Sequence, residues 1–317
     1  METSTVKQKS VPNLRPNQYK KTQTRKNYII AYIFLLPWLI GFFSLVLGPM
    51  VSSLYLSFTK FDLLNPPEWI GLANYQDMFS DDKYWASVKV TLQFVFIAVP
   101  TQLIAALLVA VLLNKGIKGV GIYRTVYYLP SLLGGSVAIA LLWKNLFGID
   151  GIINQVLGFF GIAGQGWVSH PDYALGTIII LATWQFGASM VIFLAGLKQI
   201  PSELYEAAAV DGSSKVNTFF KITLPLLSPV IFFNLVIELI KSIQVFTSAY
   251  IISEGTGGPI NSTLFYTLYL YQRGFSYFEM GFASAMAWVL VFVLGVMTIM
   301  IFLSSKFWVH YEDGGKL

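Results

Sequence analysis

Long uncharged stretches alternate with short polar connections along most of this chain. A membrane-spanning helix needs about 20 consecutive apolar residues. Five stretches of about that length contain no charged residue, and a sixth is interrupted only by Glu238 and Lys241. The pattern predicts an all-α membrane protein, with a transmembrane domain over residues 28–305 that contacts membrane lipid. Its six transmembrane helices are placed at 28–58, 90–113, 125–143, 173–197, 226–252 and 280–305.

The positions of lysine and arginine predict how these helices are oriented. Basic residues are concentrated in the cytoplasmic connections of membrane proteins. With the N-terminus inside, fifteen basic residues fall on the cytoplasmic side and five on the other side. The N and C termini and the connection 198–225 are therefore expected in the cytoplasm. Residues 1–27 are interpreted as a disordered basic tail that anchors this topology, in preference to a site for anionic lipid, and residues 306–317 as a second tail.

The composition agrees with a membrane protein and excludes several kinds of chemistry. Of the 317 residues, 55% are hydrophobic and 12% are charged, whereas about a quarter are charged in a soluble domain. There is no cysteine, and the two histidines, His170 and His310, leave almost nothing for a histidine metal site. The net charge of +5 follows from the cytoplasmic basic residues, so no nucleic acid partner is expected.

The sequence contains no motif for ATP hydrolysis. A Walker A loop needs a Gly-Lys pair followed by Ser or Thr, so that backbone amides can surround the phosphates. The Gly-Lys pair of this chain is Gly315-Lys316, and it is followed by the last residue, Leu317. The motifs His-Glu-x-x-His and Gly-x-Ser-x-Gly do not occur either. We expect a chain that is not an enzyme, binds no cofactor itself and takes its energy from another subunit.

The polar connection 198–225 carries the signals of a short helix. Pro201 is suited to its beginning, and Ser202 is expected to cap its first amide groups. Gly212 is suited to end it in a left-handed conformation, and Ser213 or Ser214 can cap a second helix. The segment reads Glu206-Ala207-Ala208, three residues, Gly212, nine residues, Ile222, one residue, Leu224-Pro225.

This pattern resembles the EAA loop of the permease subunits of binding-protein-dependent ABC importers. In that family the loop forms a coupling helix that inserts into the ATP-hydrolysing subunit. Other segments in the same order are similar to the carbohydrate-uptake branch, which includes maltose and glycerol-phosphate permeases. Among them are Trp69-Ile70-Gly71-Leu72-Ala73-Asn74-Tyr75 and Gly257-Gly258-Pro259 with Asn261. The resemblance covers about residues 28–305.

The resemblance implies a six-transmembrane-helix ABC importer permease bundle in the bacterial cytoplasmic membrane. It implies alternating-access transport of a sugar, oligosaccharide or related polyol. The implied partners are a second permease in a heterodimer, two ATPase subunits that hold ATP and Mg, an extracytoplasmic solute-binding protein and the carbohydrate substrate. The binding protein is expected to be a separate chain, because the longest outer segments, roughly 60–89 and 144–172, are too short for an inserted domain.

Two charged residues lie inside the fifth predicted helix. Glu238 is 13 residues beyond Pro225, or about 20 Å along the helix, inside a hydrocarbon core about 30 Å thick. An unpaired charge at that depth costs about 2.5–3.5 kcal/mol, so Glu238 and Lys241 are expected to pair or to face water. Asn234 and Gln244 extend the same face of the helix by about a turn each way.

Two interpretations of this polar stripe are open. It lines the translocation pathway and hydrogen-bonds a polyhydroxylated solute, or it is a structural ion pair within the helix or toward the sister permease. The alternative function is an ion-coupled secondary transporter that uses Glu238 as its coupling site, although the internal repeats typical of such transporters are not visible. The secondary candidates for the pathway are Gln93, Gln102, Trp184, Gln185 and Tyr250.

Overall fold

The computed structural model describes residues 17–116 and 118–310. The chain divides into two compact units, and the division falls between Tyr55 and Leu56 in the sequence. The first unit is a helical segment made of α1 (Asn17–Phe42), a π-helical turn η1 (Phe43–Leu47) and α2 (Gly48–Leu56). The irregular turn directly precedes Gly48 and Pro49, where the N–H of Gly48 bonds to the carbonyl of Phe43. Proline has no N–H for an α-helical bond, which accounts for an irregularity at this position.

The predicted tail 1–27 and first helix 28–58 differ from this segment. Helix α1 begins at Asn17, so the prediction of disorder is wrong for residues 17–27, while residues 1–16 lie outside the described residues. The lysine, arginine and glutamine residues there are good helix formers and extend the apolar helix that follows. The helical segment ends at Leu56.

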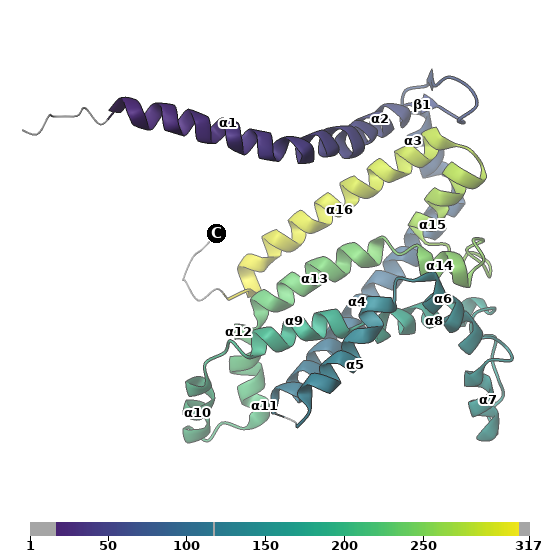
Figure 1. Ribbon diagram of the computed structural model, residues 1–317. Coiled ribbons are helices and arrows are strands. Elements are labelled where there is room, and N and C mark those ends of the chain that lie inside the picture. Colours follow the sequence, from purple (N-terminus) through teal and green to yellow (C-terminus); the bar gives the residue numbers. More distant parts are fainter. Residues whose placement is uncertain (1–16, 117, 311–317) are drawn as a thin grey trace, which may run out of the picture. The chain divides into compact units, whose positions relative to one another are not determined.

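The second unit consists of a short two-stranded ribbon and a set of helices (Figure 1). Strands β1 (Thr59–Lys60) and β2 (Glu68–Trp69) pair antiparallel. The helical elements are α3 (Ala73–Ser80), α4 (Asp82–Asn114), α5 (Val120–Leu133), α6 (Val137–Leu146), α7 (Ile152–Phe159), α8 (Pro171–Trp184), α9 (Gly187–Leu197), α10 (Ser202–Val210), α11 (Lys215–Thr218), η2 (Phe219–Thr223), α12 (Leu224–Leu226), α13 (Ser228–Ile243), α14 (Thr247–Ile252), α15 (Tyr266–Tyr271), η3 (Gln272–Ser276) and α16 (Met280–Trp308).

The described part of the chain contains between four and six candidate membrane spans. Four helical segments are long and apolar enough by themselves: Ile30–Leu56, Asp82–Asn114, Ser228–Ile252 and Met280–Trp308. The pairs α5–α6 and α8–α9 qualify only when each bent pair is counted as one span. The described residues are mostly helical and include several membrane-spanning helices, in agreement with the predicted class.

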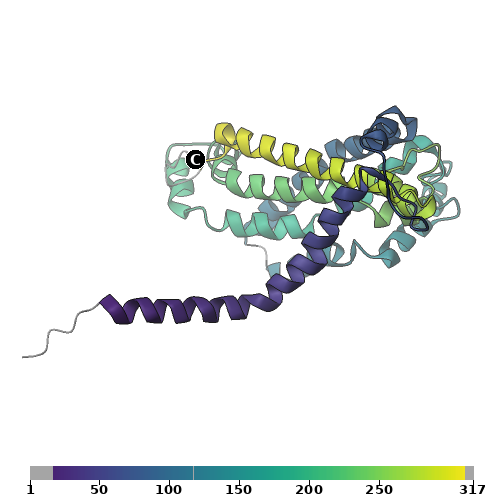
Figure 2. The same cartoon turned by 90° about the horizontal axis from the view of Figure 1, so that it is seen from above.

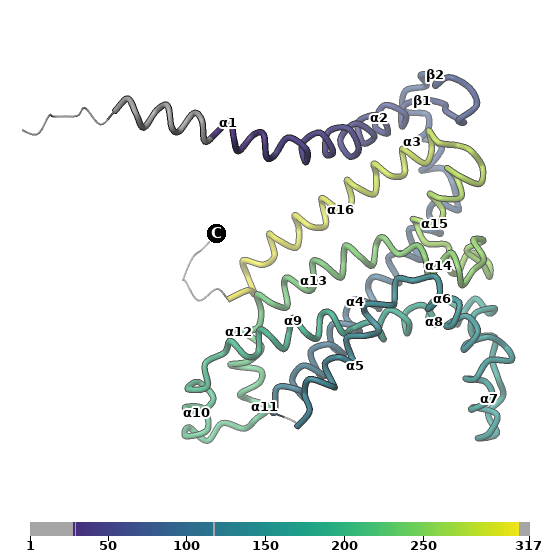
Figure 3. Tube along the Cα trace, viewed as in Figure 1, coloured from purple at the N-terminus to yellow at the C-terminus, as the bar shows by residue number. Residues whose placement is uncertain are grey.

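Three of the helices predicted as continuous are interrupted. The prediction 125–143 is wrong because α5 and α6 meet at a bend of 100° (Figure 3). The prediction 173–197 becomes α8 and α9, bent by 41°, and the prediction 226–252 becomes α13 and α14 with a gap between them. At the sharpest bend a Cβ on Gly134 would lie 2.0 Å from Cδ of Gln185, so a larger residue would displace the Gln185 side chain and its hydrogen bond to the carbonyl of Gly134. Ser136 then caps α6 by accepting a hydrogen bond from the N–H of Ile139.

The remaining helix bounds differ from the predictions mainly at their ends. Helix α4 begins at Asp82 and not at 90, because Asp81 accepts a hydrogen bond from the N–H of Lys83 at 2.8 Å and caps it. Helix α16 continues past 305 to Trp308. In the loop, Ser202 is the first residue of α10, and no side chain caps this helix at its N-cap residue, Pro201. The prediction that Ser202 caps the helix is therefore wrong.

Helix α4 is at the centre of the second unit and contacts α8, α9, α13 and α15. Its inward face is rich in alanine, and Ala98, Ala106 and Ala110 are fully buried. Small residues let neighbouring helices approach closely in membranes. Ala106 and Ala110 share an apolar cluster with Met190 and Phe193 of α9. Helices α9, α13 and α16 run alongside one another in both views (Figures 1 and 2).

At the end of the unit remote from α10, Arg273 of η3 contacts α16, and Tyr269 of α15 contacts the start of α4. Its Nε lies 2.7 Å from Oε2 of Glu279, and its guanidinium carbon lies 3.7 Å from the ring centre of Phe282 in α16. The hydroxyl of Tyr269 donates a hydrogen bond to Asp81, at the start of α4. Burial, followed by this hydrogen bond, raises the pKa of Tyr269, so the hydroxyl remains a donor.

Replacing Gly187 with alanine should destabilise the packing of α5 on α9. The new Cβ would lie 2.1 Å from the carbonyl oxygen of Tyr127 and 2.7 Å from Cα of Tyr128, so the backbones must separate. We expect a loss of about 1–3 kcal/mol, seen as a lower melting temperature of the protein in detergent. Gly176→Ala in α8 is the control, because its Cβ would meet nothing within 4 Å. Equal losses in both variants would contradict the close approach.

Candidate functional site

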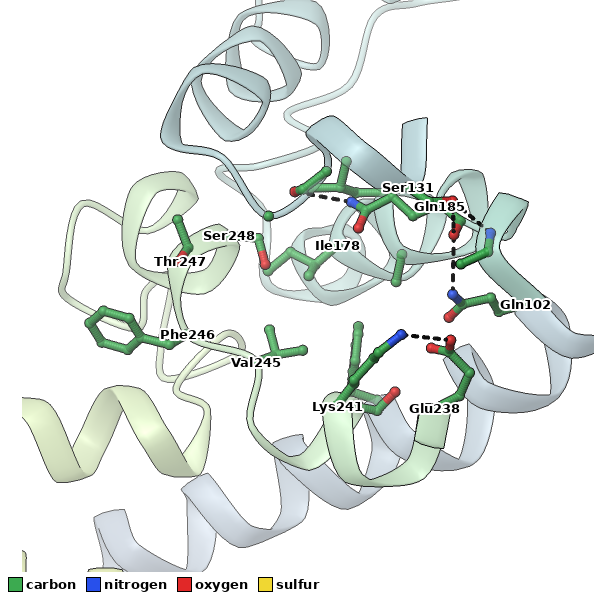
Figure 4. A pocket seen from close by; sticks show the side chains of 17 residues that line it. Gln102, Ser131, Ile178, Gln185, Glu238, Lys241, Val245, Phe246, Thr247 and Ser248 are labelled. Atoms are coloured by element: carbon green, nitrogen blue, oxygen red, sulfur yellow. Dashed lines mark hydrogen bonds and ion pairs between the residues drawn. The ribbon is translucent and has the colours of Figure 1, made fainter. Parts of the chain in front are cut away.

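A cavity of about 310 Å³ lies where three helices are interrupted (Figure 4). Its wall includes Gly134 and Gly135 between α5 and α6, Gln185 between α8 and α9, and Phe246 between α13 and α14. Non-helical backbone at membrane depth is tolerated only where it is buried in protein or lines a water-filled cavity. The interruptions and the cavity are therefore parts of one feature, which we take as the candidate site.

Ser131 and Gln185 join two of these interruptions. The hydroxyl of Ser131 donates to the carbonyl of Gln185 at 3.0 Å and accepts from the N–H of Ala188 at 2.9 Å. The side-chain amide of Gln185 donates to the carbonyl of Gly134 at 3.2 Å, and Nε2 of Gln102 lies 3.4 Å from the carbonyl of Gln185. Each bend thus supplies hydrogen-bond partners for backbone groups of the other.

The predicted charge pair lies on the cavity wall. Nζ of Lys241 is 3.2 Å from Oε1 of Glu238, and the hydroxyl of Ser189 in α9 donates to the same oxygen at 3.0 Å. The Glu238 side chain is 5% exposed and that of Lys241 is 58% exposed, so the lysine faces the open space while the carboxylate is covered. The two charges pair with each other and also line a cavity. The expectation that charges at this depth pair or face water is therefore met.

The other two residues of the predicted stripe do not line the cavity. Asn234 is buried and donates to the carbonyl of Val230 within its own helix. Gln244 is exposed and its N–H bonds to the carbonyl of Lys241 at the end of α13. Helix α13 ends at Ile243, so the helical spacing from Glu238 does not continue to Gln244.

Among the secondary candidates, Gln102 and Gln185 line the cavity. The ring of Trp184 stacks on Trp143 at 5.6 Å, and Tyr250 packs on Phe246. Gln93 lies in a separate groove on the outward face of α4. Ser131 and Ser189 were not predicted, although a single hydroxyl inside an apolar helix is a signal that could have indicated both.

An ion pair closes α6 against the loop that follows α14. Nζ of Lys144 lies 2.5 Å from Oε1 of Glu254. The hydrogen bond and the charge of Lys144 hold the pKa of the Glu254 carboxyl below its usual value. Among the described residues, no group of three or more histidine, cysteine, aspartate or glutamate side chains could hold a metal ion.

The loop 198–225 ends its first helix with a glycine turn. Gly212 has a φ of +72°, the N–H of Gly212 bonds to the carbonyl of Ala209, and the N–H of Ser213 bonds to the carbonyl of Ala208. This pair of bonds is the Schellman arrangement, in which glycine is preferred because it has no Cβ. Ser214 then caps α11 by accepting from the N–H of Asn217.

The loop exposes several large apolar side chains, and a hydrogen bond connects its first helix to its last segment. Tyr205 and Thr223 share a hydrogen bond of 3.1 Å, and Ala208 is buried. Glu206 and Ala207 are exposed, and Ile222, Leu224 and Pro225 are half-buried where the chain enters α13. The exposed apolar side chains of the loop are Leu204, Val210, Val216 and Phe220. We call these four residues the loop patch.

The sequence of residues 83–311 matches the profile of a protein family described as the binding-protein-dependent transport system inner membrane component. The chain belongs to this family. The match confirms the resemblance indicated by the loop 198–225. Membership also places the chain among multi-pass components of the inner membrane.

Individual relatives agree with this assignment. The chain is 54% identical to the probable ABC transporter permease protein YesP of Bacillus subtilis, over 93% of this chain and 96% of YesP. It is 32% identical to the lactose transport system permease protein LacF of Rhizobium radiobacter, over 87% of this chain and 94% of LacF. These names are those of permease proteins, which confirms the prediction of a transport subunit that is not an enzyme.

A solved structure shares the fold. It is a chain of a bacterial alginate ABC transporter in complex with an alginate pentasaccharide-bound periplasmic protein. The TM-score is 0.78, with 22% identity over 89% of this chain and 96% of that chain. The predicted permease fold is confirmed by this likeness.

The pair of Glu238 and Lys241 can be tested by a double-mutant cycle. Lys241→Met leaves the covered carboxylate with Ser189 as its remaining partner, so the protein should lose about 1–3 kcal/mol of stability. Glu238→Gln combined with Lys241→Met should recover most of this loss, because no charge is left unpaired. Thermal unfolding in detergent measures both. A double variant as unstable as Lys241→Met would contradict the pairing.

Proposed function

We propose that this chain is a permease subunit of an ATP-driven ABC importer that translocates a sugar, oligosaccharide or related polyol across the bacterial cytoplasmic membrane. The observation that carries the proposal is that α9 and α13 connect the loop 198–225 to the walls of the cavity. Helix α9 leads from the interruption at Gln185 to the loop, and α13 leads from the loop to the interruption before Phe246.

Alternating access requires that a movement of the loop reaches the solute. Helices α9 and α13 pack through an apolar cluster that includes Leu194, Leu197 and Leu227, and they are bonded through Ser189 and Glu238. A displacement of the loop would therefore carry both helices together and change the cavity at their far ends. Glu206, Ala207, Ala208, Gly212, Ile222, Leu224 and Pro225 would form the coupling segment, with the loop patch as the apolar surface that docks on the ATPase.

The cavity suits a hydroxyl-rich solute. Its size falls in the range of small-molecule sites, about 300–1,000 Å³. Its polar lining combines the amides of Gln102 and Gln185 with the hydroxyls of Ser242, Thr247 and Ser248. Such groups donate and accept hydrogen bonds, as sugar hydroxyls do. The lactose and alginate transporters among the similar proteins support a carbohydrate.

The partners follow from this assignment. The importer would contain a second permease, two ATPase subunits that bind ATP and Mg, and an extracytoplasmic solute-binding protein. The dependence on a binding protein is supported by the family description. Each bent pair would count as one span, which makes six spans with both termini in the cytoplasm. The ion-coupled alternative has no support, because the similar proteins named here are ABC transporter or transport-system permeases.

Replacing Gly212 with valine should abolish both transport and the stimulation of ATP hydrolysis by the binding protein. Valine is strained at a φ of +72°, so the turn that orients α10 against α11 would be lost. We expect binding-protein-stimulated ATPase activity and uptake in proteoliposomes to fall to background, while the protein remains in the membrane.

Gly71→Val is the matched control for this experiment. Gly71 also has a positive φ, +62°, and neither glycine has an atom within 4 Å of the added Cβ. Gly71 lies in the connection between β2 and α3, away from the loop. Full stimulation of the ATPase in Gly212→Val, or an equal loss in both variants, would contradict the coupling role.

The double variant Glu238→Gln with Lys241→Met should transport with a higher KM. It leaves no unpaired charge and removes the ammonium that faces the cavity. A hydrogen bond from a charged group contributes about 1.5–3 kcal/mol, so KM should rise roughly ten- to hundredfold. The measurement is uptake of an oligosaccharide that the purified binding protein binds. Lys89→Met, on the exposed face of α4, is the control. An unchanged KM would remove the pair from the pathway.

A further inference from the structure

The connection between α6 and α8 contains a helix with an exposed apolar face. Helix α7 carries Ile152, Val156 and Phe159 at a spacing of four and three residues, which places them on one face. Their side chains are 57%, 51% and 87% exposed, and Phe160, directly after the helix, is 70% exposed. This face has no covering element in the described part of the chain.

A buried asparagine fixes the orientation of this helix. The side chain of Asn154 donates to the carbonyls of Ile149 at 2.9 Å and Gln165 at 2.8 Å. Its oxygen accepts from the N–H of Gln165 at 3.1 Å and from the indole of Trp167 at 2.7 Å. These bonds hold the polar side of α7 against its own connection, so the helix cannot roll its apolar face inward.

The surroundings of α7 indicate what covers the apolar face. The helix lies at the end of the unit remote from α10, and its axis runs crosswise to α9 and α13 (Figure 1). At a membrane surface, a helix whose axis is roughly perpendicular to the membrane-spanning helices lies parallel to that surface. The preceding helix, α6, also exposes apolar side chains, at Val137, Leu141 and Leu142. The apolar face of α7 therefore follows directly on a helix that is itself suited to contact acyl chains.

The charge of the segment separates lipid from a protein partner. No charged residue occurs between Asp150 and Asp172. The rims of protein interfaces are polar, and charged groups across them steer association. Because α7 carries no charge that could pair with a partner, its aromatic and branched apolar face is better suited to the boundary between headgroups and acyl chains, where buried apolar area contributes to binding.

We propose that α7 is an interfacial anchor that inserts its apolar face, formed by Ile152, Val156, Phe159 and Phe160, into the membrane surface at the end of the bundle opposite the loop 198–225. Because the segment is uncharged, the insertion depends on apolar area and not on anionic lipid. The anchor fixes the depth of the connection between α6 and α8, two of the helices interrupted at the cavity.

The absence of native cysteine allows a direct test on the full chain. Nitroxide labels are attached to Val156→Cys, Phe159→Cys and, as the control, Gly158→Cys, which is exposed, has nothing within 4 Å of an added Cβ and lies four residues after Asn154 on the polar side of the helix. Each protein is placed in phosphatidylcholine vesicles, with and without phosphatidylglycerol. We expect the labels at 156 and 159 to collide severalfold more with oxygen than with an aqueous nickel chelate. The label at 158 should show the reverse, and the lipid composition should not change either result.

Three outcomes would overturn the proposal. Labels at 156 and 159 that collide with the nickel chelate as readily as the label at 158 would place the face in water. Labels at 156 and 159 that collide with the nickel chelate in the vesicles, and cease to do so when the purified binding protein is added, would assign the face to that protein. Labels shielded from both oxygen and the chelate in the assembled importer would place the face against another subunit.

Discussion

One constraint governs this structure: a backbone amide or carbonyl at membrane depth needs a hydrogen-bond partner other than bulk water. An interrupted helix can meet it only with side chains or with a polar cavity. Ser131 meets it for the bend between α8 and α9, since it bonds both the carbonyl of Gln185 and the N–H of Ala188. Gln185 returns a bond to Gly134 at the bend between α5 and α6. Neither bend can straighten without removing hydrogen-bond partners from the other.

The same constraint accounts for the position of the charged residues. A carboxylate inside a membrane helix needs compensation, and Glu238 has it from Lys241 and Ser189 at the wall of the cavity that the interruptions create. The pair carries no net charge, so the cavity offers a solute hydrogen bonds and one accessible ammonium. The accessible ammonium and the neighbouring amides and hydroxyls suit a solute that carries many oxygen acceptors, in keeping with the proposed carbohydrate substrate.

The loop and the cavity are mechanically continuous. Gly212 sets the angle between the two short helices of the loop, and the bond between Tyr205 and Thr223 holds the first of them to the chain entering α13. From there, α9 and α13 are uninterrupted until they reach the cavity. In the proposed importer, the chain between the loop and the cavity is thus regular helix packed against α4, and it becomes irregular where a change of shape would act on a solute.

The sequence by itself determined the membrane class, the location of the apolar segments and the loop that carries Gly212. These features depend on local properties, namely the length of uncharged runs and the conformational freedom of glycine, and the loop pattern was sufficient to identify the family. Only the tertiary structure decided where the helices break and which polar side chains meet. Gly134 and Gln185 are 51 positions apart, and nothing near either residue in the sequence specifies the other. Helical spacing put Asn234 and Gln244 on the same face as Glu238, but the Asn234 side chain bonds to the carbonyl of Val230, α13 ends before Gln244, and neither residue lines the cavity. The neighbours of a helix face are decided by packing, which a one-dimensional pattern does not contain.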